Sequence, residues 1–109
     1  MSKLKDDKVL MQIKDLAGDY LARTSNRTSL ITVTSVVMSS DMRRATIFLS
    51  VLPVEREHTV ILFTNRHKND FRDHIKAHSR IRFIPAVEFM VDEGEKNRQR
   101  ISELLENEK

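Results

Sequence analysis

The chain has 109 residues, of which 39% are hydrophobic, and this suffices for one domain with a modest core. No apolar run approaches the roughly 18 residues of a membrane span, so we expect neither a membrane anchor nor a secretory signal at the polar N-terminus. The chain contains no cysteine, which excludes disulfides, thiolate metal sites and cysteine nucleophiles and agrees with a cytoplasmic location. The formal net charge of +3 mildly favours a polyanionic partner.

The positive charge is concentrated in the interior of the chain. Residues 64–91 carry six lysines and arginines against three acidic residues, a net charge of +3. Residues 92–109 carry four basic residues against six acidic ones, a net charge of −2. A phosphate-rich partner is therefore expected to contact the interior segment rather than the C-terminal tail.

Residues 5–22 are predicted to form an amphipathic helix. Val9, Ile13, Ala17 and Tyr20 recur at steps of three and four residues, which places them on one helical face. This face is expected to pack against the core.

Two strands are predicted to follow as an antiparallel hairpin. Residues 30–38 are rich in β-branched side chains, and residues 45–52 alternate between apolar and polar positions. Residues 39–41, Ser-Ser-Asp, have the short polar side chains that favour a turn. Pro53 cannot donate a hydrogen bond to a ladder, so we expect the second strand to end before it.

The second half of the chain is predicted to contain a kinked helix, a strand and a last helix. Residues 55–78 have a helical pattern, but residues 64–70 contain no apolar side chain, which indicates a kink or two shorter helices. The next strand is expected to begin after Pro85, and a charged helix is expected over residues 95–108.

This order of helix, strand, strand, kinked helix, strand and helix indicates an α+β fold, a three-stranded sheet with helices on one face. The order is that of a type II KH domain. We therefore predict a single KH-like RNA-binding domain over residues 1–109, with a core at 5–92 and a charged C-terminal helix or tail at 93–109.

Short motifs along the chain resemble those of one bacterial family, ribosome-binding factor A, in the right order and with similar spacing over about residues 5–106. The hairpin turn resembles the family's Ser-Pro-Asp-Leu, and the last strand and last helix resemble its Arg-x-x-Pro-x-Leu-x-Phe and Arg-Ile-x-x-Leu-Leu segments. The matching residues here are Arg27, Ser39–Met42, Phe48–Leu52, Arg82, Pro85, Val87, Phe89 and Arg100–Leu105.

The resemblance implies a non-enzymatic factor with a variant KH fold. Members of this family bind the small (30S) ribosomal subunit and its 16S rRNA, act in late maturation and rRNA processing, and are linked to cold adaptation. The expected partner is therefore the small subunit with its rRNA, without a cofactor or a membrane, and the protein is expected to be a monomer.

One segment departs from the family pattern. The family has an Ala-x-Gly kink between two helices, whereas the matching positions here are His67, Lys68 and Asn69. Asn adopts left-handed backbone geometry more readily than most residues, so a kink at Asn69 remains compatible with the sequence.

Recognition of RNA by shape and phosphate is the expected chemistry. An ordinary KH domain clamps nucleotides with a Gly-x-x-Gly loop, and a chain whose two glycines are Gly18 and Gly94 has no such loop. Arginine and lysine side chains remain, and the alternative for each is a solvated surface position. The candidate RNA-binding residues are Arg43, Arg44, Arg66, Lys68, Arg72, Lys76, Arg80 and Arg82.

Aromatic side chains could also stack on bases. Most of them, including Phe63, Phe71, Phe83 and Phe89, fall at positions that are in phase with the core. Phe48 is out of phase with its neighbours and is expected on the opposite face of the sheet, which makes it a weak stacking candidate.

Other functions are less well supported by the sequence. Asp70, His74 and His78 share one helical face and could bind a metal, but nearby arginines and lysines would oppose a cation. A small hydrolase lacks a recognisable triad or glycine-rich loop. The main alternative is a protein-interaction module in which the acidic last helix or the kink binds a partner protein without direct RNA contact.

Overall fold

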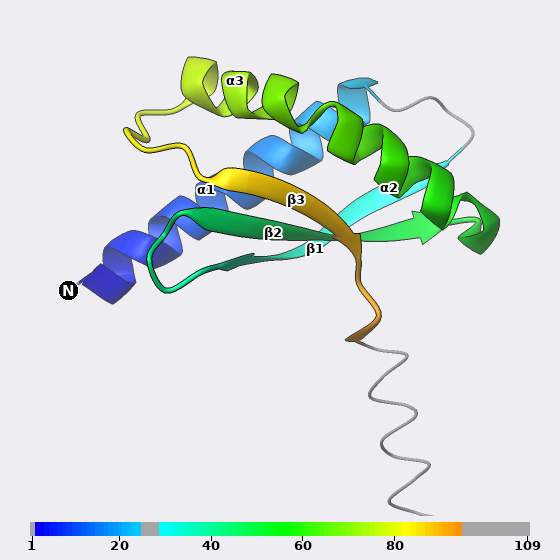
Figure 1. Ribbon diagram of the computed structural model, residues 1–109, viewed down its shortest axis with the longest axis horizontal. Coiled ribbons are helices and arrows are strands. Elements are labelled where there is room, and N and C mark those ends of the chain that lie inside the picture. The colour runs from blue at the N-terminus through cyan, green and yellow to red at the C-terminus, as the bar shows by residue number, and fades with distance from the viewer. Residues whose placement is uncertain (1, 25–28, 95–109) are drawn as a thin grey trace, which may run out of the picture.

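A computed structural model describes residues 2–24 and 29–94 (Figure 1). The predicted helix over residues 95–108 lies outside the described residues, as do the family motifs at Arg27 and Arg100–Leu105. The described elements are α1 (Ser2–Thr24), β1 (Leu30–Met38), β2 (Arg44–Leu52), the 3-10 helix η1 (Val54–Arg56), α2 (Glu57–Arg66), α3 (Lys68–His78) and β3 (Ala86–Val91).

The three strands form one mixed sheet in the order β1, β2, β3. β1 and β2 are antiparallel and form the predicted hairpin, whereas β3 lies parallel to β2 on its other side. The connection between β2 and β3 is made by α2 and α3, as parallel strands require a crossover. The three α-helices of the described residues lie on one side of the sheet, which confirms the predicted α+β arrangement (Figure 1).

The core lies between the helices and this face of the sheet. The predicted face of α1 is correct, because Ile13, Ala17 and Tyr20 are buried, and α1 extends a few residues beyond each predicted end. Alternate residues of β2 are buried against the helices, as the alternating sequence predicts. The buried hydrophobic cluster comprises Ile13, Ala17, Tyr20, Leu21, Ile47, Leu49, Val51, Val60, Phe71, Ile75, Val87 and Phe89.

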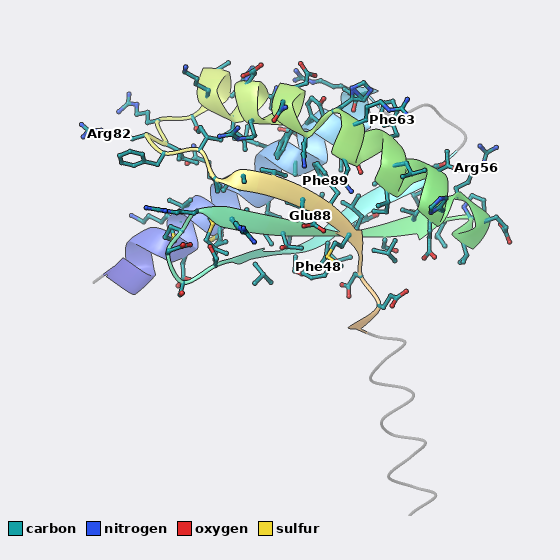
Figure 2. The ribbon with its side chains drawn as sticks, viewed as in Figure 1. Phe48, Arg56, Phe63, Arg82, Glu88 and Phe89 are labelled. Carbon is teal, nitrogen blue, oxygen red and sulfur yellow. The ribbon has the colours of Figure 1, made fainter. Side chains whose placement is uncertain are left out.

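Phe48 points to the face of the sheet opposite the core. It pairs with Ser35 on β1 and with Met90 on β3, and its side chain is half-buried (Figure 2). A bulge between Val33 and Ser35 changes which residues of β1 face the core, so that Val36 follows Val33 on the inner face. The expectation for Phe48 is confirmed.

The break between α2 and α3 falls at His67, within the predicted gap. His67 has φ −102° and ψ 14°, and its N–H lies 3.2 Å from the carbonyl oxygens of both Phe63 and Thr64. The histidine ring packs against Phe63 in an edge-to-face arrangement, with 4.4 Å between ring centroids. A histidine therefore fits where the family has a small residue. Asn69 lies within α3, so the break does not use the left-handed geometry that an asparagine there would allow.

The side chain of Asn65, near the end of α2, links the helix break to the sheet. The Asn65 side-chain amide donates to the carbonyl oxygen of Phe89 at 3.1 Å, and its Oδ1 accepts from the Phe89 N–H at 2.8 Å. Among the described residues, β3 is an edge strand, so these backbone groups have no strand partner there on that side. Asn65 therefore supplies the hydrogen bonds that a further strand would make.

Candidate nucleic-acid interface

The hairpin turn between β1 and β2 is held by short polar contacts. The Ser39 hydroxyl donates to Asp41 Oδ1 at 2.6 Å, and the Arg43 N–H donates to the same oxygen at 3.0 Å. These two hydrogen bonds lower the pKa of Asp41 below its usual value, and the one from Ser39 has the larger effect. Met42 has a positive φ of 63°, which directs the chain back into β2. The turn thereby places Arg43 and Arg44 at its exposed end.

The loop between α3 and β3, residues 79–85, is held beside this turn. The Ser79 hydroxyl donates to the Ile75 carbonyl at 2.7 Å and ends α3. At the other end of the loop, the Ala86 N–H donates to the Arg43 carbonyl at 2.8 Å. The parallel pairing of β3 with β2 therefore brings the loop and the hairpin turn together.

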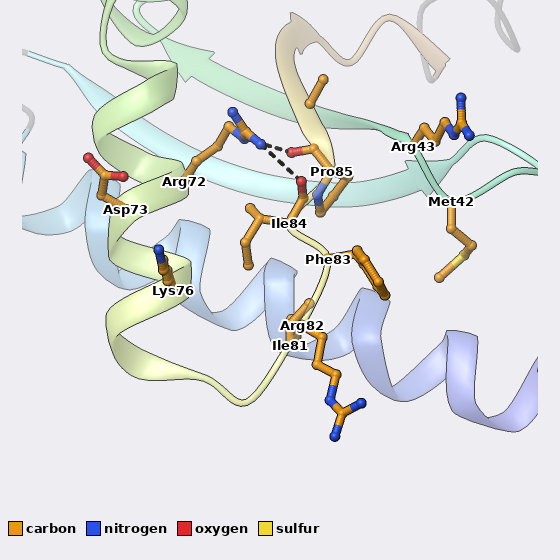
Figure 3. A pocket seen from close by; sticks show the side chains of 11 residues that line it. Met42, Arg43, Arg72, Asp73, Lys76, Ile81, Arg82, Phe83, Ile84 and Pro85 are labelled. Atoms are coloured by element: carbon orange, nitrogen blue, oxygen red, sulfur yellow. Dashed lines mark hydrogen bonds between the residues drawn. The ribbon is translucent and has the colours of Figure 1, made fainter.

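Arg72 fixes the course of this loop from α3. Its Nε donates to the Pro85 carbonyl and its Nη2 to the Ile84 carbonyl, each at 3.0 Å (Figure 3). The planar guanidinium suits two nearby acceptors, because its donors form a rigid fork. Arg72 is half-buried and engaged by the protein itself. Arg72 therefore positions the loop, and the direct phosphate contact that the sequence suggested for it stays a prediction.

A hollow of about 690 Å³ opens between the hairpin turn, α3 and this loop (Figure 3). Four basic residues and one acidic residue line it, so that the ionisable side chains of the hollow carry a net charge of +3. Excess positive charge in a recess raises the local concentration of anions. The charged residues are Arg43, Arg72, Asp73, Lys76 and Arg82.

Phe83 is the aromatic residue of this site, and its predicted place in the core is wrong. Its side chain is 87% exposed and lines the hollow together with Met42 and Arg82 (Figure 3). Phe83 precedes Pro85 in a loop, so it belongs to no strand and the alternation of strand positions does not apply to it. The proline at position 85 was the signal in the sequence that could have revealed this.

The other predicted basic residues are divided between two places. Arg80 lies on the same loop and lines an adjoining hollow of about 610 Å³. Arg66 and Lys68 flank the helix break, at the other end of α3, which is about 16 Å long at 1.5 Å per residue. Both are exposed. The structure thus gathers Arg43, Lys76 and Arg82 and leaves Arg66 and Lys68 apart from them; Figure 2 shows Arg82 far from the α2 residue Phe63.

The face of α3 with Asp70, His74 and His78 packs toward α1. The Tyr20 hydroxyl donates to Asp70 Oδ2 at 2.7 Å, and burial followed by this carboxylate raises the pKa of Tyr20 above its usual value. The His74 ring lies 5.5 Å from that of Tyr20 and 4.1 Å from that of His78. Partial burial, and then the neighbouring His78, lowers the pKa of His74. Within residues 2–24 and 29–94, no three His, Asp or Glu side chains are arranged to hold a metal ion.

The helices of the described part of the chain include none long and apolar enough to span a membrane. The candidate site is the charged hollow with its exposed aromatic ring. The sequence identified the basic residues of this site, but it identified neither Phe83 nor the role of Arg72.

Comparison with known proteins agrees with the motifs in the sequence. A family model described as ribosome-binding factor A matches residues 5–105. A ribosome-binding factor A from Thermodesulfovibrio yellowstonii is 39% identical over 79 residues, which cover 72% of this chain and 67% of that protein. One from Phenylobacterium zucineum is 34% identical over 79 residues, and the match spans only 54% of its length.

One longer match and one solved structure agree with these comparisons. A ribosome-binding factor A from Natranaerobius thermophilus is 29% identical over 108 residues, covering 96% of this chain and 82% of that protein. The crystal structure of ribosome-binding factor A from Thermus thermophilus has a TM-score of 0.69 and covers 78% of this chain and 93% of that one. At 17% identity, this likeness shows a shared fold. The family model, which spans nearly the whole chain, and the Thermodesulfovibrio relative show that the chain belongs to the ribosome-binding factor A family.

Proposed function

We propose that this protein binds the small (30S) ribosomal subunit through its 16S rRNA and assists late maturation and rRNA processing. It acts by binding, without a cofactor, as a cytoplasmic monomer, and its role becomes most important in the cold. Membership of a family of ribosome-binding factors supports a ribosomal partner. The observation that supports rRNA as the target is the hollow in which Arg43, Lys76 and Arg82 gather from three segments of the chain.

Phosphate is the group that best fits this hollow. Lysine and arginine side chains bind phosphate oxygens through charge-assisted hydrogen bonds, and each neutralised phosphate releases condensed counterions. Arg72 already binds two loop carbonyls, so it holds Ile84 and Pro85 in place while the exposed cations contact the RNA. Arg44 and Arg80 extend the basic surface on either side, and Arg66 and Lys68 contribute longer-range attraction.

A pair of charge-matched variants tests this proposal. Lys76→Ala/Arg82→Ala removes one lysine and one arginine at the hollow, and Arg66→Ala/Lys68→Ala removes the same two residue types at the helix break. Each variant and the unaltered protein are co-sedimented with isolated small subunits across a salt series. All four side chains are exposed, so both variants are expected to fold.

We expect the hollow variant to bind about tenfold or more weakly, with a shallower dependence on salt by about one unit of slope per lost phosphate contact. The variant at the helix break is expected to lose no more than about threefold, since it removes only longer-range attraction. Equal binding by all three proteins would contradict rRNA recognition at the hollow. It would favour the alternative, in which a protein of the subunit is the contact.

A further inference from the structure

The aromatic ring of Phe83 is exposed and does not pack in the core. It lies in the loop that Arg72 fixes, 87% exposed, directly after Arg82 in the sequence. Large apolar side chains at isolated surface positions are common, but this one borders two hollows at once. Its surroundings therefore decide what the ring can bind.

The two hollows on either side of this loop differ in chemistry. One is lined by Arg43 and Lys76, which can bind an anion. The other is lined by the apolar side chains of Val9 and Met38, together with Arg80. Met42, Arg82 and Phe83 are common to both.

An unpaired nucleotide combines the two chemical groups that such a place would recognise. Its base has a flat apolar face that stacks on aromatic rings, and its phosphate is an anion that binds arginine and lysine. A paired base hides its faces within the helix stack, so a duplex would meet only the cations. An apolar protein segment would fit the ring but would leave the net positive charge of the hollow without a partner.

We infer that Phe83 is a stacking platform for one unpaired RNA base, seated over the apolar side chains of Met38 and Met42, while the flanking phosphates bind Arg43, Lys76 or Arg82. This inference rests on the proposed function and deepens it, because it names the kind of RNA that the hollow takes. Recognition of RNA is then not confined to shape and phosphate. The chain binds single-stranded RNA without a Gly-x-x-Gly loop. Because every base has a stacking face, this contact selects unpaired over paired RNA and is tolerant of sequence.

Two substitutions of Phe83 separate stacking from apolar bulk. Phe83→Leu keeps an apolar side chain but removes the aromatic face. Phe83→Trp keeps the face and introduces a tryptophan into a chain that has none, so that its fluorescence reports only on this position. Phe63→Trp, at the helix break, is the matched control, because Phe63 is also partly exposed, at 38%, and lies outside the hollow.

The probes are a fluorescein-labelled oligouridylate of about 12 nucleotides and a fully paired RNA with the same number of phosphates. We expect Phe83→Leu to bind the oligouridylate about tenfold more weakly and the duplex within about twofold of the unaltered protein. The salt dependence is expected to stay the same, since no phosphate contact is removed. The emission of Phe83→Trp is expected to be quenched by the oligouridylate, and that of Phe63→Trp is expected to remain unchanged.

Three outcomes would overturn the stacking role: undiminished binding of the oligouridylate by Phe83→Leu, equal losses for single-stranded and paired RNA, or unquenched emission of Phe83→Trp at saturating RNA. If the unaltered protein still co-sediments with small subunits, any of these defeats the inference and leaves the proposed function standing. If the unaltered protein binds neither subunits nor RNA, the proposed function fails and the inference fails with it.

Discussion

The helix break before α3 and the loop after α3 use their side chains differently. Around the helix break, the side chains of Asn65, Tyr20 and His67 are all engaged by other parts of the protein. In the loop after α3, Arg72 holds two carbonyls, and Arg82 and Phe83 project outward.

The contrast indicates how the chain separates stability from binding. A side chain that is needed for folding is not free to exchange its partner for a ligand. A loop whose backbone is fixed from within can offer several exposed side chains in a defined arrangement, and this lowers the entropy lost on binding. Changes to the engaged side chains should therefore alter stability, and changes to the exposed side chains of the loop should alter binding.

Asn65→Ala is expected to have the largest effect on stability among single changes that test this division. It leaves the Phe89 N–H and carbonyl without their partner and should lower the free energy of unfolding by about 2–3 kcal/mol. Urea denaturation followed by circular dichroism measures the loss. Asn69→Ala, at an exposed position of α3, is the control, and it should change the free energy of unfolding by no more than about 0.5 kcal/mol. A loss of RNA affinity in folded Asn65→Ala, as large as that of Lys76→Ala/Arg82→Ala, would break the comparison.

Arg72→Lys tests whether this residue positions the loop or contacts RNA by charge. Lysine keeps the positive charge but cannot bind the two carbonyls as a planar fork, so we expect a loss of about 1–2 kcal/mol in stability. RNA affinity should fall about threefold, because the loop is less well ordered before it binds. Lys76→Arg also keeps its charge and should bind RNA normally. Unchanged stability of Arg72→Lys would show that the two hydrogen bonds do not hold the loop.

Tyr20→Phe removes the hydroxyl that binds Asp70 and leaves the ring in the core. We expect a loss of about 1 kcal/mol, the value of one partly buried hydrogen bond. The pKa of Tyr20 is raised, so the hydroxyl stays protonated and the loss should be constant between about pH 6 and 9. Thermal unfolding at several pH values measures it. RNA affinity should be unchanged, and a weaker affinity would bring this face of α3 into the binding surface.

His74 should give the smallest effect, a mild dependence of stability on pH. Its pKa in the folded protein is lowered from 6.5, so the unfolded chain binds more protons in the window between the two values. Stability is then full above pH 6.5, falls as the pH decreases through that window, and levels off below the folded-state pKa. His74→Gln should reduce the difference in unfolding free energy between about pH 7.5 and 5.5. An identical pH dependence in this variant would assign the effect to other groups.

Local sequence patterns determined much of the fold. The step of three and four residues placed Ile13, Ala17 and Tyr20 on the buried face of α1, and the alternation of β2 placed Phe48 on the outer face. The apolar gap at residues 64–70 located the break at His67. These features depend on the hydrophobic periodicity of single helices and strands, which the order of neighbouring residues determines.

The tertiary structure alone decided which residues form the candidate site. Arg43 and Arg82 are far apart in the chain and line the same hollow because β3 pairs in parallel with β2, and no local pattern specifies that register. The same pairing places the loop carbonyls beside Arg72, so an arginine predicted to bind RNA is engaged within the protein. Phe83 is exposed because its loop lies outside the sheet, where the alternation of a strand no longer assigns a side chain to a face. The sequence determined the basic charge and the elements that carry it, and long-range strand pairing decided where that charge meets an aromatic ring.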